Sequence, residues 1–477
     1  MNESGLAWSP SPALSSRSVV TLASLSALLA SLDSSVNIAF PAITAAFTLD
    51  VTLIQWVVVS YVLTYASLLL GCGRLADLWG HGRVLTWGLA GSTLAFLLCG
   101  LAPTFAWLLV ARTLQGVGVA LVFAAAPALV TLAVPVETRG RALGIFHMSA
   151  AAGFALGPLL GGVLVDSFGW RSVYLFRVLP AFLLTLLAAG QSHIAHEHQN
   201  DQHFDLVGAL TLAGSVAGFL LAVSRGRDLG WASPLVLVLV VVASACLAGF
   251  VMTEARVNAP VVDLSLFRRP AFTVANLLNV LANCAMFAIW LLVPYYIVNA
   301  LGYPAFIGGV LLMACPLATA LAAPLAGQLS DRLGTSLLST LGLGTEALGL
   351  WGISRLDTAS SSISLALTLA LVGLGLGIFQ TPNMSFVMGT IPRTQQGVAG
   401  GMSQMMRTLG VVLGVTGASM LFGSRRTVHA GRLHLSTVSD SQTFIPAFQD
   451  VFVVAAVVCA VAFGLSLLRR PESSRSL

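Results

Sequence analysis

Lysine is absent from this chain, and charged residues of either sign are scarce. All 23 basic residues are arginine, and charged residues make up 9% of the 477 residues, compared with about 25% in an average soluble protein. With 57% hydrophobic residues, the chain lacks the polar side chains that would cover a soluble domain of this size. The composition excludes an ordinary water-soluble globule and predicts a protein embedded in the lipid bilayer.

The sequence also lacks the motifs of metal, nucleotide and catalytic sites. Its six cysteines show no CxxC spacing and lie in or beside apolar runs. Neither a phosphate-binding loop nor a catalytic triad is present, which disfavours an ATP-driven pump. The net charge of +5 comes mostly from arginines in short loops, so it does not indicate nucleic acid as a partner. We expect no enzyme activity, no cofactor and no metal.

One polar stretch leaves two interpretations open. It carries a group of histidines and acidic residues between two apolar runs. These residues form either a metal site or, as we favour, a solvated linker. The histidines are His193, His196, His198 and His203.

Apolar runs long enough to cross a bilayer, which takes about 20 residues, follow one another along the chain. Fourteen such runs predict an all-α polytopic membrane protein. They are residues 19–40, 52–72, 84–101, 105–126, 142–165, 172–190, 207–225, 234–252, 272–298, 306–326, 337–354, 363–386, 397–420 and 447–468.

A repeated motif divides these runs into two related halves. The pattern G-x-L-x-D-x-x-G occurs at residues 73–80 and again at 327–334, each time after the second run of a half. Eight runs intervene, so two extra helices separate two six-helix bundles. The expected order is an N-terminal segment (1–18), the first bundle (19–190), a loop (191–206), two additional helices (207–252), a loop (253–271), the second bundle (272–468) and a tail (469–477).

The orientation follows from the arginines in the loops. They are more frequent on the side that holds the N-terminus, which is therefore expected to be cytoplasmic. Because the span count is even, the C-terminus lies on the same side. We expect a multi-pass protein of the inner cell membrane with both termini in the cytoplasm.

Five motifs make the resemblance to a known family specific. One is the loop of residues 73–83, which carries Gly73, Asp77, Gly80 and Arg83, with Asp331 in the second copy. The fourth run holds R-x-x-Q-G-x-G from Arg112, and the first holds an acidic motif at residues 32–41. The thirteenth run holds G-x-A-x-G at 397–401 with Arg407 and Gly410. The fifth run holds G-x-x-x-G-P-x-x-G-G, with Gly153, Gly157, Pro158, Gly161 and Gly162.

Together these motifs resemble the major facilitator superfamily, and within it the fourteen-span drug:proton antiporters. The resemblance implies that two bundles rock about a central cavity and export small amphipathic molecules against protons, acting as a monomer. It assigns gating to the glycine motifs and proton coupling to the motif of Arg112. Two alternatives stay open: a dedicated exporter of an endogenous metabolite such as a self-made antibiotic, siderophore or lipid precursor, or a non-transporting sensor or scaffold.

The chain departs from the family pattern at two places. Leu78, His81 and Gly82 stand where the loop motif usually carries basic residues. The sixth run has Arg177 where the family often has asparagine.

Ionisable residues inside the spans are costly and therefore indicate function. Asp33 and Arg112 lie at matched depth, roughly 10 Å below the outer ends of their spans, so we expect them to pair. Glu346 and Arg407 lie near the middle of their spans and are a second candidate pair. We expect proton coupling at Asp33 and Arg112, while for Glu346 a structural role and proton carriage are equally open.

Polar residues three, four or seven apart form stripes on four of the predicted helices. These helices are the first and fourth of each half, which in the superfamily fold line the central cavity. The stripes predict a substrate site, although hydrogen bonding between helices is the alternative. They contain Asn37, Gln115, Asn276, Asn279, Asn283, Trp290, Gln380 and Asn383, beside Asp33 and Arg112.

Overall fold

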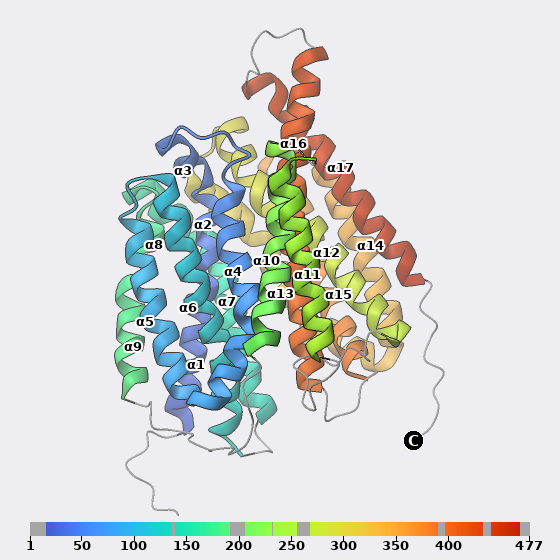
Figure 1. Cartoon of the computed structure of the whole chain (residues 1–477). Coiled ribbons are helices and arrows are strands. Elements are labelled where there is room, and N and C mark those ends of the chain that lie inside the picture. Colours follow the sequence, from blue (N-terminus) through green and yellow to red (C-terminus); the bar gives the residue numbers. More distant parts are fainter. Residues whose placement is uncertain are drawn as a thin grey trace, which may run out of the picture.

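The computed structural model describes residues 16–135, 139–190, 206–230, 232–254, 268–389, 396–432 and 440–467. Within these ranges every regular element is a helix (Figure 1). The N-terminal half consists of α1 (Ser16–Ser31), η1 (Leu32–Ser34), α2 (Ser35–Ile38), α3 (Phe40–Ala46), α4 (Gln55–Trp79), α5 (His81–Gly100), α6 (Phe105–Leu132), α7 (Arg139–Phe168), α8 (Ser172–Leu175) and α9 (Val178–Ala189).

The remaining helices continue this plan. A helix pair, α10 (Leu206–Leu229) and α11 (Pro234–Glu254), separates the halves in sequence. The C-terminal half consists of α12 (Pro270–Tyr295), η4 (Tyr296–Ala300), α13 (Ala305–Leu333), α14 (Thr335–Ile353), α15 (Ser362–Gly389), α16 (Gln396–Arg432) and α17 (Asp440–Leu467).

Each of the fourteen apolar runs overlaps a helix of the described chain. By length and composition, eleven helical stretches of the described residues can cross a membrane. One boundary prediction was wrong: the thirteenth run was expected to end at residue 420, but α16 continues as a helix to Arg432. Its 37 residues make a helix of about 55 Å, which is longer than the ~30 Å hydrocarbon layer.

The two halves pack along α7 and α13 and along α4 and α16. The pair α10–α11 lies against α4 and α16 at the seam between the halves, where Figure 1 shows it in green. Close glycine contacts hold this pair together: a Cβ on Gly218 would lie 3.0 Å from that of Ala243. The additional helices therefore cover the outside of the seam.

The repeated loop motif forms the same turn in both halves. Gly80 ends α4 and Gly334 ends α13, with φ of 90° and 88°. Only glycine adopts this conformation without strain, so the motif ends one helix and starts the next within a single residue. The internal repeat seen in the sequence is thus also a repeat of backbone geometry.

Candidate functional site

The first span is irregular where it carries Asp33. The helix narrows to a 3-10 turn at Leu32–Ser34 and resumes as α2. The hydroxyl of Ser34 donates to the carbonyl oxygen of Phe154 on α7 at 2.9 Å. This turn presents the carboxylate of Asp33 to α6 and α8–α9.

Asp33 is the centre of a buried network. Arg112 binds it with both guanidinium nitrogens, Nη1 to Oδ1 at 2.7 Å and Nη2 to Oδ2 at 2.9 Å. Gln115 Nε2 donates to the same Oδ1 at 2.8 Å and its Oε1 accepts from Arg112 at 2.9 Å. The predicted pairing of Asp33 with Arg112 is confirmed, and Gln115 belongs to the same network.

Arg112 is held in place by α4 and by its own motif. Its Nε donates to the carbonyl oxygen of Val57 at 2.9 Å, and its guanidinium lies 4.4 Å from the centre of the Tyr61 ring. A Cβ on Gly116 would lie 2.7 Å from the carbonyl oxygen of Tyr61, and one on Gly118 would lie 2.9 Å from that of Gly88. The motif glycines therefore let α6 approach α4 and α5 closely enough to fix the arginine.

The structure adds Arg177 to the network. Nη1 of Arg177 donates to Oδ1 of Asp33 at 2.9 Å, and its Nε donates to the carbonyl oxygen of Val173 at 3.1 Å. The guanidinium lies 4.4 Å from the centre of the Phe96 ring. Among the described residues its Nη2 has no acceptor. The buried network thus combines one carboxylate with two guanidinium groups and carries a net charge of +1.

The glycines of the fifth span let α7 pack closely against both the first span and α13 of the other half. Cβ atoms on Gly153, Gly157 and Gly161 would overlap α1, η1 and α2, and one on Gly162 would lie 2.5 Å from the carbonyl oxygen of Ala305. Across the same interface, a Cβ on Gly309 of α13 would overlap the carbonyl of Pro158. The motif therefore packs α7 between the first span and the other half.

Contacts between the halves gather at one end of the bundle, which we call the α3 end; it holds residues 44–54, 166–172 and 300–309. Asp166 at the end of α7 accepts hydrogen bonds from the backbone N–H groups of Ala305 and Phe306 at 3.1 and 2.7 Å. Ser419 donates to the carbonyl oxygen of Thr52 at 3.0 Å. The hydroxyl groups of Thr44 and Tyr295 are also hydrogen-bonded.

Glu346 and Arg407 do not meet. Glu346 is fully buried, and neither of its carboxyl oxygens has a hydrogen-bond partner among the described residues. It packs against Gly375 of α15 and lies near the thiol of Cys459 on α17. Arg407 lies instead beside Tyr65 of the other half. Both residues have suitable depth, but α14 and α16 present them in different directions.

The asparagine stripe of α12 is largely engaged in hydrogen bonds between and along helices. Asn276 accepts from the hydroxyl of Ser403 at 3.0 Å, and Asn279 donates to the Ser403 carbonyl at 3.0 Å. Asn283 donates to Asn279, and Asn383 donates to the carbonyl oxygen of Ala275 at 3.2 Å. In this conformation Asn276, Asn283 and Asn383 are buried, whereas Asn37, Asn279 and Gln380 are partly exposed.

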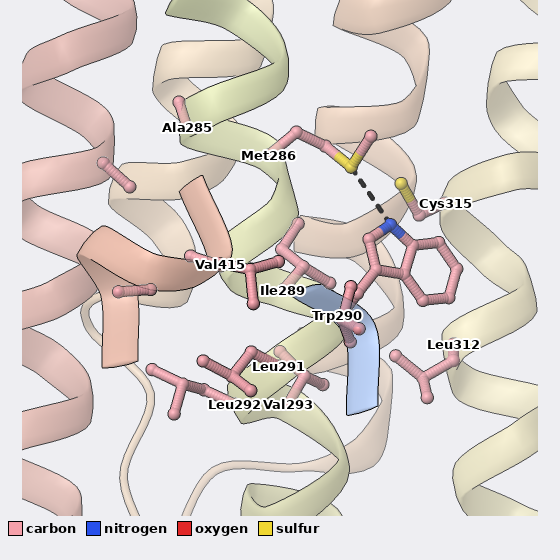
Figure 2. Packing of buried hydrophobic residues seen from close by; sticks show 14 of the residues in the cluster. Ala285, Met286, Ile289, Trp290, Leu291, Leu292, Val293, Leu312, Cys315 and Val415 are labelled. Atoms are coloured by element: carbon pink, nitrogen blue, oxygen red, sulfur yellow. Dashed lines mark hydrogen bonds between the residues drawn. The ribbon is translucent and has the colours of Figure 1, made fainter. Parts of the chain in front are cut away.

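Trp290 lies at the contact between the halves. Figure 2 shows its indole Nε1 donating to the sulfur of Met286 at 3.1 Å, with Leu312 and Cys315 of α13 beside the ring. Its ring also meets Phe154 of α7 edge-on at 5.1 Å between centroids. Trp290 is 2% exposed, so it closes the interface in this conformation.

The described residues of the loop motif make few contacts with other helices. A Cβ on Gly73 would meet no described atom within 4 Å, so this glycine makes no close contact with another described helix. Arg83 is exposed. The side chains of Asp77 and Asp331 lie outside the described residues, as do the four histidines of residues 193–203.

Comparison with known proteins gives the family. The profile described as Major Facilitator Superfamily matches residues 22–415. The chain belongs to this superfamily. It is 33% identical over 381 residues to the multidrug resistance protein Stp of Mycobacterium tuberculosis, covering 80% of this chain and 70% of that protein. It is 29% identical to the tetracenomycin C resistance and export protein of Streptomyces glaucescens, covering 88% and 79%.

A solved superfamily structure confirms the fold. A bacterial homologue of the human lysosomal transporter Spinster superposes with a TM-score of 0.72 at 15% identity, covering 95% of this chain and 96% of that chain. This superfamily member is therefore a multi-pass membrane transporter of the type to which multidrug and antibiotic resistance proteins belong.

Proposed function

We propose that the chain exports small, amphipathic molecules in exchange for protons by alternating access. In this account it crosses the inner membrane fourteen times, with both termini in the cytoplasm. The chain acts as a monomer whose two six-helix bundles rock against each other. The two additional helices of residues 207–252 lie along the seam between the bundles. Its relatives named for drug resistance and export support this direction of transport.

The observation that carries the proposal is the network around Asp33. A carboxylate that accepts charge-assisted hydrogen bonds from two guanidinium groups is stabilised while ionised. Protonation of Asp33 removes the only negative charge of the network and leaves Arg112 and Arg177 uncompensated. Each proton taken up therefore changes which arrangement of the surrounding helices has the lower free energy.

The free energy released or consumed by this change of charge is large enough to switch the conformation. Leaving a buried charge without its partner costs about 3–5 kcal/mol. Moving a two-state equilibrium from 1:99 to 99:1 takes about 5.5 kcal/mol. Loss of the carboxylate charge next to two buried arginines is thus comparable to the free energy needed to switch the conformation.

Under the predicted topology, each end of the helix bundle can be assigned to one side of the membrane. With the N-terminus inside, the α3 end faces the outside, so its contacts between the halves close the outer entrance. Protonation of Asp33 from the outside then requires the contacts of Asp166, Ser419 and Trp290 to open. In this account the fifth-span glycines keep the outer closure tight and prevent a leak.

Glu346 is the alternative candidate for proton carriage, and its surroundings favour a structural role instead. An ionised carboxyl without hydrogen-bond partners is expensive to bury, so this residue is best accommodated when neutral. Its position between α14, α15 and α17 separates it from the Asp33 network. We propose that Asp33 carries the coupled proton and that Glu346 supports the packing of the C-terminal half.

A growth-inhibition panel tests the proposal. An efflux-deficient host expressing the chain should resist several chemically different drugs, and a protonophore should abolish the accompanying efflux of a fluorescent substrate. A dedicated metabolite exporter would protect against one compound class only. If neither resistance nor efflux is seen although the protein is present in the membrane, the transport function is excluded in favour of a sensor or scaffold.

A further inference from the structure

An aromatic stripe on α4 connects the Asp33 network to the other half. Val57, Tyr61 and Tyr65 follow one another at four-residue intervals and share one face of the helix. Val57 and Tyr61 contact Arg112, as described above. The rings of Tyr61 and Tyr65 stack at 6.4 Å between centroids and 12° between planes. Phe123 of α6 meets Tyr65 edge-on at 6.0 Å.

The far end of this stripe faces a cation of the C-terminal half. Tyr65 lies within hydrogen-bonding reach of Gln404 on α16, and Arg407, about one helical turn further along α16, is close enough to interact with it electrostatically. Arg407 is partly exposed, and no carboxylate of the described residues forms an ion pair with it. Hydrogen-bond donors of Arg407 and Gln404 are therefore next to an aromatic surface at the seam between the halves.

Among the side chains that the structure describes, the charges around this surface are unbalanced. Asp33 is opposed by Arg112 and Arg177, and Arg407 adds a third cation. Glu346 does not compensate them, because it is buried among α14, α15 and α17 without contact to any of the three arginines. The described side chains at the seam therefore form a positively charged environment with stacked tyrosine rings.

We infer that the transported molecules are planar aromatic compounds carrying an acidic group, such as a carboxylate or a phenolate. The ring system packs against Tyr61, Tyr65 and Phe123, and the acidic group pairs with Arg407, assisted by Gln404. An aromatic cation of equal size meets repulsion from Arg407 at the same place. The inference rests on the proposed export function and specifies its substrate class.

Two dyes that share one ring system test the inference. Fluorescein is an anionic xanthene and rhodamine 6G is a cationic one, and binding of both to the purified full-length chain is measured by fluorescence anisotropy. Fluorescein should bind at least about tenfold more tightly than rhodamine 6G, the difference expected for one charge-assisted contact. Tighter binding of rhodamine 6G, or no binding of fluorescein, overturns the inference.

Variants test whether Arg407 and Tyr65 are responsible for the preference for fluorescein over rhodamine 6G. Arg407→Gln should weaken fluorescein binding about tenfold without weakening rhodamine 6G, whereas Arg407→Lys should retain most of the preference. Tyr65→Ala should weaken both dyes. Arg355→Gln, which alters an exposed arginine beside Trp351, is the matched control and should change neither. Thermal unfolding of each purified variant confirms that it is folded, and an unchanged preference in folded Arg407→Gln contradicts the assignment.

The inference on substrate charge can fail while the proposed export function stands, and the experiments distinguish the two cases. If rhodamine 6G and not fluorescein is exported in a proton-dependent manner, the export function stands and the inference on substrate charge is wrong. If no compound of the drug panel is exported and neither dye binds, both fail.

Discussion

Arg177 and Asp33 are joined by a hydrogen bond of 2.9 Å, and the accepting oxygen is the one that also binds Nη1 of Arg112. One carboxylate oxygen thus serves two buried cations from different helices. Because the second cation exceeds the available negative charge, it makes protonation of Asp33 more costly. Under the proposed mechanism, Arg177 therefore sets how large a proton gradient is needed to protonate Asp33.

Replacing Arg177 tests this assignment. In Arg177→Met the apolar side chain fills the space beside Phe96 while the Asp33–Arg112 pair remains. With one cation fewer, Asp33 takes up a proton at lower proton concentration, so the pH of half-maximal efflux should move upward. Efflux of a fluorescent substrate is measured in inverted vesicles across a pH series. An unchanged pH profile in the folded variant would show that Arg177 is only structural.

Asp166 gives a prediction about the outer closure. In Asp166→Asn the N-terminus of α13 loses a negative charge, which is worth about 1 kcal/mol, so the open population at the α3 end should rise about fivefold. Spin labels on cysteines at Thr48 of the α3 end and at Ser361, which directly precedes α15, report the distance between the halves in a background without the six native cysteines; both positions are exposed. An identical distance distribution in Asp166→Asn would exclude this latch.

The fifth-span motif can be tested with matched glycines. A Cβ on Gly157 would overlap the hydroxyl of Ser34 next to Asp33, whereas a Cβ on Gly417 of α16 would meet no described atom within 4 Å. Gly157→Ala should destabilise the protein by about 1–3 kcal/mol through overpacking and reduce transport. Gly417→Ala should be neutral or slightly stabilising. Thermal unfolding in detergent and efflux assays measure both effects, and equal behaviour of the two variants would contradict the packing role.

Part of this site was predictable from the sequence. Apolar run length located the helices, and matched depth in the spans predicted the pair of Asp33 and Arg112. Arg177 stood out only as a departure from a family pattern, although its position five residues into the sixth run places it near the same depth. Comparing the depths of all intramembrane charges would have suggested the third partner.

Other contacts could not be predicted from the sequence, because they depend on the rotation of each helix about its axis and on the relative position of the two halves. Glu346 and Arg407 matched in depth, but rotation about the helix axis, which depth does not specify, separates them. The contact of Asp166 with Ala305 and Phe306 depends on the relative position of two halves that are distant in sequence. The hydrogen bonds of the asparagine stripe likewise required the neighbouring α15 and α16.

Accessibility of single cysteines tests the predicted substrate cavity. Cysteines at the partly exposed Asn37, Asn279 and Gln380 should react with water-soluble thiol reagents, and an exported drug should protect them. Cysteines at the buried Leu278 and Leu376 are the controls and should remain unreactive. Asn283, which is fully buried here, should react only when transport is under way. Equal labelling of both faces would remove these residues from the site.

The topology prediction has a simple readout. A C-terminal fluorescent-protein fusion should fluoresce and a C-terminal alkaline phosphatase fusion should be inactive, because both termini are expected in the cytoplasm. Phosphatase activity of the C-terminal fusion would reverse the assignment of the α3 end to the outside.

Proton exchange in proteoliposomes tests the central claim most directly. The purified chain is reconstituted with a pH-sensitive dye in the lumen, and proton and substrate movements are recorded together under an imposed proton gradient. The wild type should move substrate and protons in opposite directions, and Asp33→Glu should retain part of this exchange. Asp33→Asn should insert and remain folded but show neither movement driven by the gradient. Gradient-driven transport by Asp33→Asn at the wild-type rate, or wild-type substrate transport without any proton movement, would contradict the account.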